Sequence, residues 1–371
     1  MRIALFTGTL SVGGAQRQLV LLARALAERG HEVLVVVLFR GGTYEAELSG
    51  VRSIRLVVLR GAPRFGALSR GIGIVVAPLA LRRLLRRERI DRLYSLLHLP
   101  NALAWFASVG SLRHTLVWGL RDSATELPWK RAVPFHFCRG VSASVPRVVS
   151  NSRAALEAFD RAGFRFPKAS VVPNGIDLDR FRPDPSGARA LRFELGVTPA
   201  APLLGIVGRL VPEKKGHEVF LEAAQRLRRE IPDACFLVVG DGRPEVRARL
   251  RARAEALGLA GCVHWLHARD ALSPVYSALS VLACCSFAEG FPNVVCEALA
   301  CGTPCVVTDV GDCASIVDDP RRVVPPGDPE ALARAIREAL SCPPSDTRAA
   351  IASRFSPAAL AEGTLRALGD G

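Results

Sequence analysis

The order of elements at the start of the chain limits its fold more than any other feature. Residues 2–39, RIALFTGTLSVGGAQRQLVLLARALAERGHEVLVVVLF, have the pattern of an apolar strand, a glycine turn, an amphipathic helix and a second strand. Apolar side chains recur in the helix with a period of 3.6 residues, at Leu19, Leu22, Ala23 and Leu26. This is a βαβ unit, whose crossover is right-handed and whose strands are parallel. The pattern predicts an α/β protein.

The alternation continues in two series. The first has strand-like runs near residues 52–59, 92–97, 115–120, 147–150 and 169–172. The second starts with PLLGIVGRL, continues through a helix at 216–230, and has further strands at ACFLVVGDG, VHWLH, VLACC and CVVTDV. Between them, PNGIDLDRFRPDPS (173–186) breaks the periodicity with proline, aspartate and glycine and is expected to be a linker.

We therefore predict two Rossmann-like domains with parallel sheets, residues 1–178 and 179–355, facing one interdomain cleft. Residues 356–371 would form a terminal helix that packs back on the first domain. A chain of 371 residues can supply a core for each domain, and a hydrophobic content of 49% excludes disorder.

The charge balance is basic, with 49 Lys and Arg against 35 Asp and Glu, a formal net charge of +14. Such a surplus attracts nucleic acid, phospholipid surfaces or phosphorylated ligands, although a genome biased toward Arg and Ala would explain it equally well. No basic stretch interleaved with aromatic residues is present, so we expect no nucleic-acid partner.

Nothing at the start of the chain has the pattern of a signal peptide, and no apolar run is long enough to span a bilayer, so we expect a cytoplasmic protein that can rest on a membrane. The ten cysteines lie in strand-like and helix-like runs without a CxxC pair, and His264 with His267 lacks a matching ligand set. We expect reduced thiols and no metal site.

Two common nucleotide-binding motifs are absent. TGTLSVGGAQ, after the first strand, lacks the GxGxxG pattern, and GRLVPEKKG lacks the ending of a Walker A loop. Gly13 and Gly14 still precede a helix, where the backbone can approach an anion closely, although a plain tight turn fits them equally well.

Basic residues follow the first strand of the second series. Gly208 and Arg209 stand at the strand end, and Lys214 and Lys215 precede a helix. Cations at this position can neutralise a diphosphate. Arg209 fits this role better than the lysines, since a lysine pair before a helix is usually a solvated face.

Two glutamates eight residues apart, Glu289 and Glu297, lie in EGFPNVVCEALACGTPCVVTDVGD (289–312). A helix is predicted to start near Pro292 or Asn293, so that the amides of the turn can cradle phosphate or a hydroxyl group. Glu297 could accept hydrogen bonds from ribose hydroxyls and Glu289 from hexose hydroxyls. A glycosidase pair fits less well, because its carboxyl groups flank the scissile bond and usually come from different strands.

Taken together, these segments resemble the family 4 retaining glycosyltransferases of the GT-B fold. The resemblance covers nearly the whole chain: GGAQRQLVLLARALAERGHEV, VVPNGIDLDRFRPD, GRLVPEKKGHEVFLEAA, the segment with the two glutamates, and VVPPGDPEALARAI. It implies a hexosyltransferase that uses a nucleoside-diphosphate sugar, in the synthesis of cell-envelope polysaccharide or glycolipid, without a cofactor.

The resemblance also implies roles for individual residues. Arg209 and either Lys214 or Lys215 would stabilise the donor diphosphate, Glu289 would bind the transferred sugar, and Glu297 the ribose. Backbone groups that would lie near the donor belong to Gly14, Gly208, Phe291, Asn293 and Val294.

One departure from the family pattern concerns the first domain. Many members have a histidine after the fifth strand, where this chain has Arg121 and Asp122 after TLVWGL. Arg121 could contact phosphate or the acceptor, with Asp122 orienting it. His98 is another candidate near a strand end, although a lone histidine is more often structural.

Retention of configuration without an obvious protein nucleophile points to front-face transfer. A saccharide or lipid-linked saccharide is the acceptor that we expect. The arginines of RRLLRRERIDR (82–92) beside an apolar helix face would suit contact with an anionic membrane, and a solvated basic helix is the alternative. A sugar-nucleotide epimerase, a phosphorylase and a non-catalytic anion-binding or nucleic-acid-binding protein remain as alternative functions.

Overall fold

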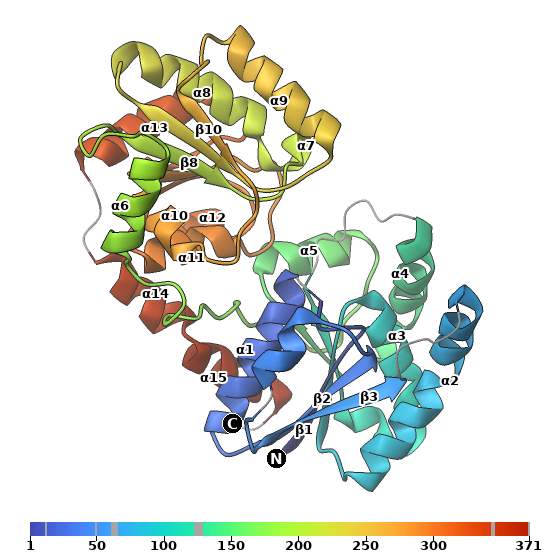
Figure 1. Cartoon of the computed structure of the whole chain (residues 1–371). Helices are drawn as coiled ribbons and strands as arrows, with labels where there is room; N and C mark the ends of the chain where they lie inside the picture. Colours follow the sequence, from blue (N-terminus) through green and yellow to red (C-terminus); the bar gives the residue numbers. More distant parts are fainter. Residues whose placement is uncertain (12, 49, 61–65, 122–128, 343–345, 370–371) are drawn as a thin grey trace. The chain divides into compact units, whose positions relative to one another are not determined.

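The structure is a computed structural model that describes residues 1–11, 13–48, 50–60, 66–121, 129–342 and 346–369. The chain is divided into two units (Figure 1). The first unit comprises Met1–Gly175 together with Pro357–Gly371, and the second comprises Ile176–Ser356. Each unit is built on one parallel sheet, so the predicted fold of two Rossmann-like parallel-sheet domains is confirmed.

The sheet of the first unit has the strand order β3-β2-β1-β4-β5-β6-β7. The strands are β1 (Arg2–Thr7), β2 (Glu32–Phe39), β3 (Ile54–Arg60), β4 (Arg92–Leu96), β5 (Leu116–Leu120), β6 (Arg147–Ser150) and β7 (Ala169–Val171). The helices are α1 (Gly14–Glu28), α2 (Gly66–Arg87), α3 (His98–Ala107), α4 (Trp129–Val141), α5 (Arg153–Arg161) and α15 (Pro357–Leu368), with short 3₁₀ turns at Thr43–Leu48, Gly110–Thr115 and Ser142–Ser144.

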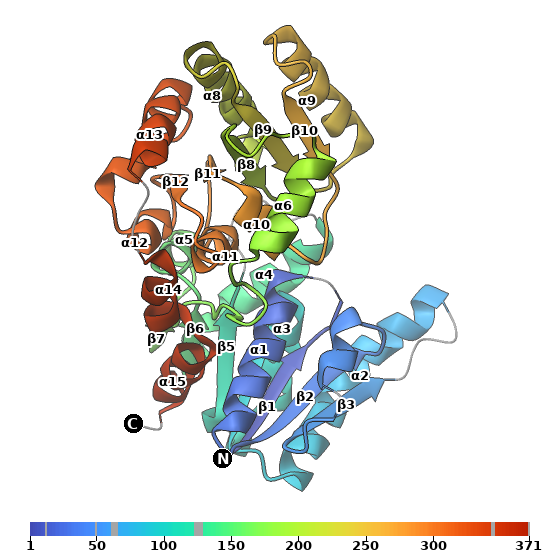
Figure 2. The same cartoon turned by 60° about the vertical axis from the view of Figure 1, so that its left-hand side comes forward.

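Both faces of this sheet are covered by helices. Alternate residues of β1 point to opposite faces, so Ile3 and Leu5 pack with α1 and α15, whereas Ala4 and Phe6 pack with α2, α3, α4 and α5. Figure 2 shows α15 beside α1. The last helix of the chain therefore contributes to the core of the first unit.

The sheet of the second unit has the strand order β10-β9-β8-β11-β12-β13. The strands are β8 (Leu203–Val207), β9 (Cys235–Val239), β10 (Val263–Leu266), β11 (Val281–Cys284), β12 (Cys305–Thr308) and β13 (Val323–Val324). The helices are α6 (Pro185–Glu194), α7 (Pro212–Lys215), α8 (His217–Glu230), α9 (Pro244–Ala256), α10 (Ser273–Ala278), α11 (Asn293–Ala300), α12 (Cys313–Val317), α13 (Pro329–Ser341) and α14 (Thr347–Phe355), with a 3₁₀ turn at Pro320–Arg322.

In each sheet the strand order reverses once, between β1 and β4 in the first unit and between β8 and β11 in the second. In open parallel sheets, ligands bind outside the carboxyl ends of the strands at this reversal. The fold alone therefore directs attention to the segments that follow β8 and β11.

The predicted linker is partly wrong, because Pro185 and Ser186 begin α6. The side chain of Asp184 caps this helix by accepting a hydrogen bond from the backbone N–H of Gly187 at 2.9 Å, and proline is well suited to the first helical position. Two residues at the boundary between the units, Gly175 and Ile176, are held by hydrogen bonds. The side-chain amide of Gln18 binds the carbonyl and the N–H of Gly175, at 2.8 and 2.9 Å. The N–H of Ile176 donates to the carbonyl of Phe355 at 2.7 Å.

Within the described residues, no helix combines the length and apolar character needed to cross a bilayer. All ten cysteines are free thiols, most of them buried in the second unit.

Candidate functional site

Lys215 and Glu289 form an ion pair at the strand reversal of the second unit. Lys215 ends α7, which follows β8, and Glu289 lies in the loop after β11. The Nζ of Lys215 contacts Oε1 of Glu289, and Ser286 Oγ donates to the same oxygen at 2.6 Å. The side chain of Lys215 is 22% exposed and that of Glu289 is 9% exposed. The pair is therefore mostly buried, but part of it remains accessible to a ligand. The neighbouring strands β8 and β11 therefore bring together two residues that are far apart in sequence.

Gly216 explains why the lysine reaches the glutamate. Its φ of 69° lies in the left-handed region, and a Cβ atom added there would come within 1.9 Å of the carbonyl oxygen of Cys285. The close approach lets the N–H of Phe287 donate to the carbonyl of Lys214 at 2.9 Å. The two loops are thereby joined through their backbones, and Lys215, rather than Lys214, contacts Glu289.

Arg209 directly follows the strand β8 and the backbone of Gly208. The N–H of Gly208 donates to the carbonyl of Val239 at 2.9 Å, which holds the strand end against β9. The side chain of Arg209 is exposed, and its guanidinium makes no hydrogen bond or ion pair with the residues that the structure describes. It is therefore a cation available to an anionic ligand at the same sheet edge as Lys215.

Glu297 occupies a different environment from Glu289. It lies on α11 with 1% of its surface exposed, and its Oε2 accepts a hydrogen bond of 2.7 Å from the phenol of Tyr276. Sequence reasoning missed Tyr276, which lies in a short helix, α10, with no motif of its own. The α11 helix begins at Asn293 with Pro292 as the N-cap residue, so the predicted start of this helix is confirmed.

The other residues predicted near the donor differ in burial. Phe291 is buried, and its ring packs edge-on against Phe355 with the centroids 5.3 Å apart, so only its backbone can serve a ligand. Asn293 and Val294 are half-buried in the first turn of α11.

In the first unit, Gly13 and Gly14 lie at the start of α1. Gly13 is the N-cap residue, and none of the side chains that the structure describes caps the helix there. Among these residues, the first turn of α1 therefore presents backbone N–H groups without a capping side chain. These glycines belong to a different unit from the Lys215–Glu289 pair.

Arg121 follows β5 and is fixed by two partners. Its Nη1 donates to Oδ1 of Asn174, and its Nη2 donates to the phenol of Tyr94 at 3.1 Å. The guanidinium therefore fastens residue 174 to the carboxyl edge of the sheet. Asp122 lies outside the described residues.

His98 is buried among aromatic rings. Its ring meets Phe135 edge-on at 5.2 Å and Phe159 at 5.8 Å, and its carbonyl accepts from the thiol of Cys138. This environment fits the structural alternative for His98.

His217 is an unusual neighbour of the Lys215–Glu289 pair. It is 1% exposed, and neither ring nitrogen has a hydrogen-bond partner among the described residues. Burial, assisted by the positive charge of Lys215, lowers the pKa of His217 to about 4. The imidazole is therefore neutral at physiological pH.

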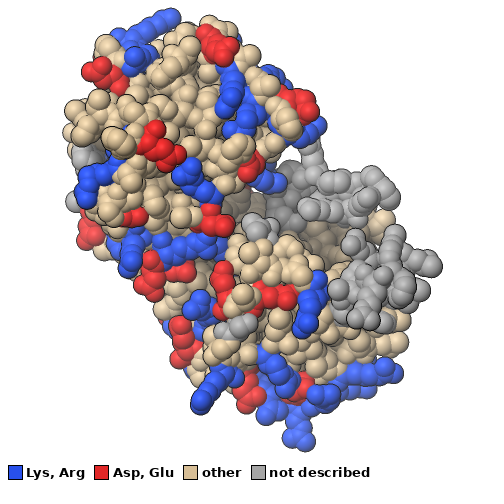
Figure 3. Space-filling model, viewed as in Figure 1, with Lys and Arg blue, Asp and Glu red and all other residues tan. Residues whose placement is uncertain are grey.

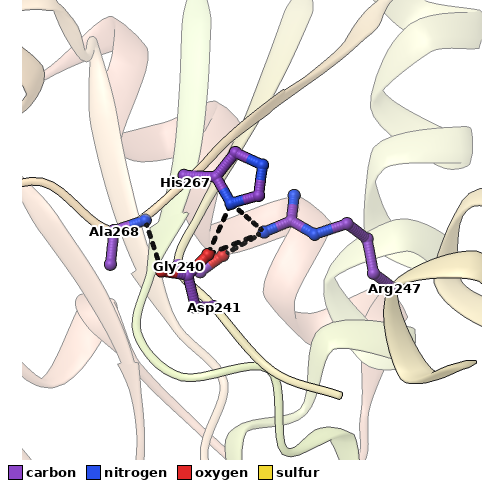
Figure 4. Close-up of polar contacts among 5 residues, drawn as sticks. All are labelled: Gly240, Asp241, Arg247, His267 and Ala268. Atoms are coloured by element: carbon purple, nitrogen blue, oxygen red, sulfur yellow. Dashed lines mark hydrogen bonds and ion pairs between the residues drawn. The ribbon is translucent and has the colours of Figure 1, made fainter. Parts of the chain in front are cut away.

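A second polar cluster lies at the ends of β9 and β10 (Figure 4). Asp241 Oδ1 lies 2.7 Å from Nδ1 of His267 and 3.2 Å from Nη2 of Arg247, and its Oδ2 accepts from the N–H of Ala268 at 3.3 Å. The hydrogen bond to His267 is the main cause that lowers the pKa of Asp241. The GDG sequence after β9 was the available signal for this cluster, and sequence reasoning missed it.

Among the described residues, no group of three or more His, Cys, Asp and Glu side chains is placed to hold a metal ion. Arg209, Lys215 and Glu289 are charged side chains at the strand reversal of this sheet, where β8 and β11 end.

Comparisons with known proteins identify the family. A family model described as Glycosyltransferase Family 4 matches residues 12–180, and one described as Glycosyl transferases group 1 matches residues 201–342. A D-inositol 3-phosphate glycosyltransferase of Xylanimonas cellulosilytica is 31% identical over 349 residues, which cover 88% of this chain and 83% of that protein. The chain belongs to glycosyltransferase family 4.

Other relatives in this family match over a shorter span. D-inositol 3-phosphate glycosyltransferases of Segniliparus rotundus and Corynebacterium jeikeium are each 40% identical over 157 residues. These matches span only 34% and 37% of the length of those proteins.

Similarity to solved structures supports the GT-B fold of this chain. HepE of Anabaena, determined in complex with UDP, has a TM-score of 0.81 at 23% identity, with both chains covered completely. A sucrose-phosphate synthase of Thermosynechococcus elongatus has a TM-score of 0.77 at 22% identity, with coverage of 98% and 97%. At these identities the similarity concerns the fold.

Proposed function

We propose that this family 4 member transfers a sugar from a nucleoside-diphosphate sugar to a saccharide or lipid-linked saccharide, with retention of configuration, in the synthesis of cell-envelope polysaccharide or glycolipid. The observation that carries the proposal is the Lys215–Glu289 pair beside the exposed Arg209 at one sheet edge. A donor diphosphate needs cations at its oxygens, and its sugar needs hydrogen-bond acceptors for its hydroxyl groups. This edge of the second unit supplies both.

The comparisons support a donor of this kind. The relatives are named as glycosyltransferases, and HepE is described in complexes with UDP and with UDP-glucose. By analogy, the diphosphate would lie near Arg209 and Lys215, the transferred sugar near Glu289, and the ribose near Glu297.

The chemistry follows from these charges. The hydroxyl oxygen of the acceptor bonds to the anomeric carbon on the face from which the diphosphate departs, and the hydroxyl proton passes to the departing phosphate oxygen. Arg209 and Lys215 stabilise the negative charge that develops on the diphosphate. Since side chains provide this positive charge, we propose that the reaction requires neither a metal ion nor a cofactor.

The acceptor is assigned to the first unit, and a membrane surface is a partner consistent with α2. On the exposed side of α2, Val75 and Leu79 are 77% and 60% exposed, and Arg83 and Arg86 follow with helical spacing. Figure 3 shows Lys and Arg side chains gathered at the lower end of this unit. An apolar stripe that leads into arginines suits an anionic lipid surface, on which a lipid-linked acceptor would lie.

The experiment that tests the function has two steps. Thermal-shift screening of UDP-, GDP- and ADP-sugars identifies the donor, because a ligand that binds the native state raises its apparent stability. Release of free nucleoside diphosphate is then followed with and without candidate saccharide acceptors. Release of nucleoside diphosphate that depends on an acceptor supports transfer. Epimerised donor without release would indicate an epimerase. Formation of a sugar phosphate from inorganic phosphate would indicate a phosphorylase. Binding of none of the donors would contradict the proposal.

A further inference from the structure

Tyr276 is the partner of the buried carboxylate of Glu297. The phenol oxygen lies 2.7 Å from Oε2 of Glu297, and both residues are at most 1% exposed. A carboxylate buried to this extent is costly unless hydrogen bonds compensate for the lost water. The distance is in the range of strong bonds to carboxylates. The phenol therefore restrains the direction in which this carboxylate points.

Tyr276 is itself fixed from several directions. Its N–H donates to the carbonyl of Leu272 within the α10 turn at 2.9 Å, and its carbonyl accepts from Thr303 Oγ1 at 2.6 Å. Its ring packs beside Phe181 with the centroids 6.3 Å apart. Thr303 follows α11, the helix that carries Glu297, so the same chain segment holds the backbone of Tyr276 and receives its phenol. A side chain restrained in this way has little freedom to turn, which makes it a fixed point for the carboxylate.

We propose that Tyr276 is a positioning residue that orients Glu297 toward the ribose hydroxyls of the nucleotide. The inference rests on the proposed function, in which Glu297 binds the ribose. Tyr276 does not touch the ligand and acts through the carboxylate. Its phenol fixes the plane of the carboxylate, so that an oxygen atom meets the ribose without first having to rotate.

The test measures binding, and it does not need a known acceptor. The probes are whichever of UDP, GDP and ADP binds the wild-type protein most tightly, and the 2′,3′-dideoxy form of the same nucleotide. In Tyr276→Phe, the affinity for the normal nucleotide should fall roughly tenfold, because a misaligned carboxylate loses about one hydrogen bond to a charged group. The affinity for the dideoxy form should stay at its wild-type value, because that ligand has no ribose hydroxyls to lose. A purely structural effect would weaken both ligands alike.

Two further variants make the result decisive. Tyr44→Phe removes the hydroxyl of a buried tyrosine of the first unit and should leave both affinities unchanged. In a Glu297→Ala background, addition of Tyr276→Phe should cause no further loss, because the side chain through which the tyrosine acts is no longer present. This double variant leaves no buried carboxyl group without its partner, so it remains informative if Tyr276→Phe alone is too unstable to purify.

Each outcome bears on a separate statement. Unchanged binding of the normal nucleotide by Tyr276→Phe, equal weakening of both probes, or a further loss in the Glu297→Ala background would overturn the positioning role. If no nucleoside diphosphate binds the wild-type protein, the proposed function itself fails.

Discussion

His217 should make the second unit sensitive to moderate acid. The ring is buried and unpartnered among the described residues, and burial lowers its pKa from 6.5 to about 4. In the unfolded chain the same ring has its ordinary pKa, so between pH 6.5 and pH 4 the unfolded state binds a proton that the folded state does not. The neutral state of His217 therefore contributes no loss of unfolding free energy above pH 6.5, and the loss that it causes grows as the pH decreases toward 4.

The size of this effect follows from the change in the pKa. Each tenfold change in proton affinity corresponds to about 1.4 kcal/mol, so the lowering from 6.5 to about 4 amounts to about 3 kcal/mol. That is a considerable part of the 5–15 kcal/mol that typically separates folded from unfolded domains. The loss should be about half complete near pH 5.

The assay is urea denaturation of the wild-type protein and of His217→Leu at pH 7.5, 6.5, 5.5 and 4.5. Leucine has a similar size and does not titrate, and it removes two ring nitrogens that lack partners. We expect His217→Leu to be at least as stable as the wild type at pH 7.5 and to exceed it by a margin that grows to about 2.5 kcal/mol at pH 4.5. Because the two units can unfold separately, the urea curve can show two unfolding transitions. The free energies are compared for the transition whose midpoint changes in His217→Leu.

Two variants complete the experiment. His114→Leu replaces an exposed histidine and should leave the pH dependence of the wild type unchanged. His217→Gln keeps a polar group and should still remove the acid sensitivity. A difference between wild type and His217→Leu that is the same at every pH would refute the reasoning.

Four further perturbations test other parts of the structure. Arg209→Ala should lower kcat by roughly 10²–10³ while the melting temperature stays unchanged, because the side chain is exposed; unaltered turnover would rule out its role at the diphosphate. Gly216→Ala should lower the free energy of unfolding by more than about 1 kcal/mol. The loss should exceed that of Gly302→Ala, because Gly302 has a similar φ of 84° but a Cβ atom added there would meet no atom within 4 Å. Equal losses would mean that the contact with Cys285 is unimportant. Activity should survive dialysis against EDTA, and an activity that returns only with added divalent cation would contradict the side-chain scheme. Leu79→Glu should reduce sedimentation of the protein with vesicles that contain anionic lipid. Phe193→Glu is the control, because Phe193 lies on the second unit and is 89% exposed, and this variant should sediment like the wild type. If Leu79→Glu also sediments like the wild type, α2 is not the contact.

The fold could be predicted from sequence because its signal is local. The periods of strands and helices and the breaks at glycine and proline lie within short windows, and parallel pairing follows from the βαβ order. The edge of the linker was harder to place, because α6 begins where Asp184 caps it, inside a segment rich in proline and aspartate.

The candidate site was only partly predictable. Arg209 and Glu289 stand out by their place after strands, and Glu297 by its spacing of eight residues from Glu289. Which lysine contacts Glu289 depends on how Gly216 packs against the backbone of Cys285, which no local pattern encodes. Tyr276 was missed because its bond to Glu297 joins α10 and α11, and its burial arises only when these helices pack. The polar cluster around Asp241 depends in the same way on the pairing of β9 with β10.

The path of the chain also determines the order in which its parts can mature on the ribosome. The second unit is an insertion within the first, and its ends meet where the N–H of Ile176 donates to the carbonyl of Phe355. The core of the first unit includes Leu360, Ala361 and Leu368, which are synthesised after the whole of the second unit. The inserted unit can therefore complete its structure during translation, whereas the first unit must wait for α15 to emerge. A nascent chain released just before residue 357 would have a folded second unit and a first unit whose core lacks the side chains of α15.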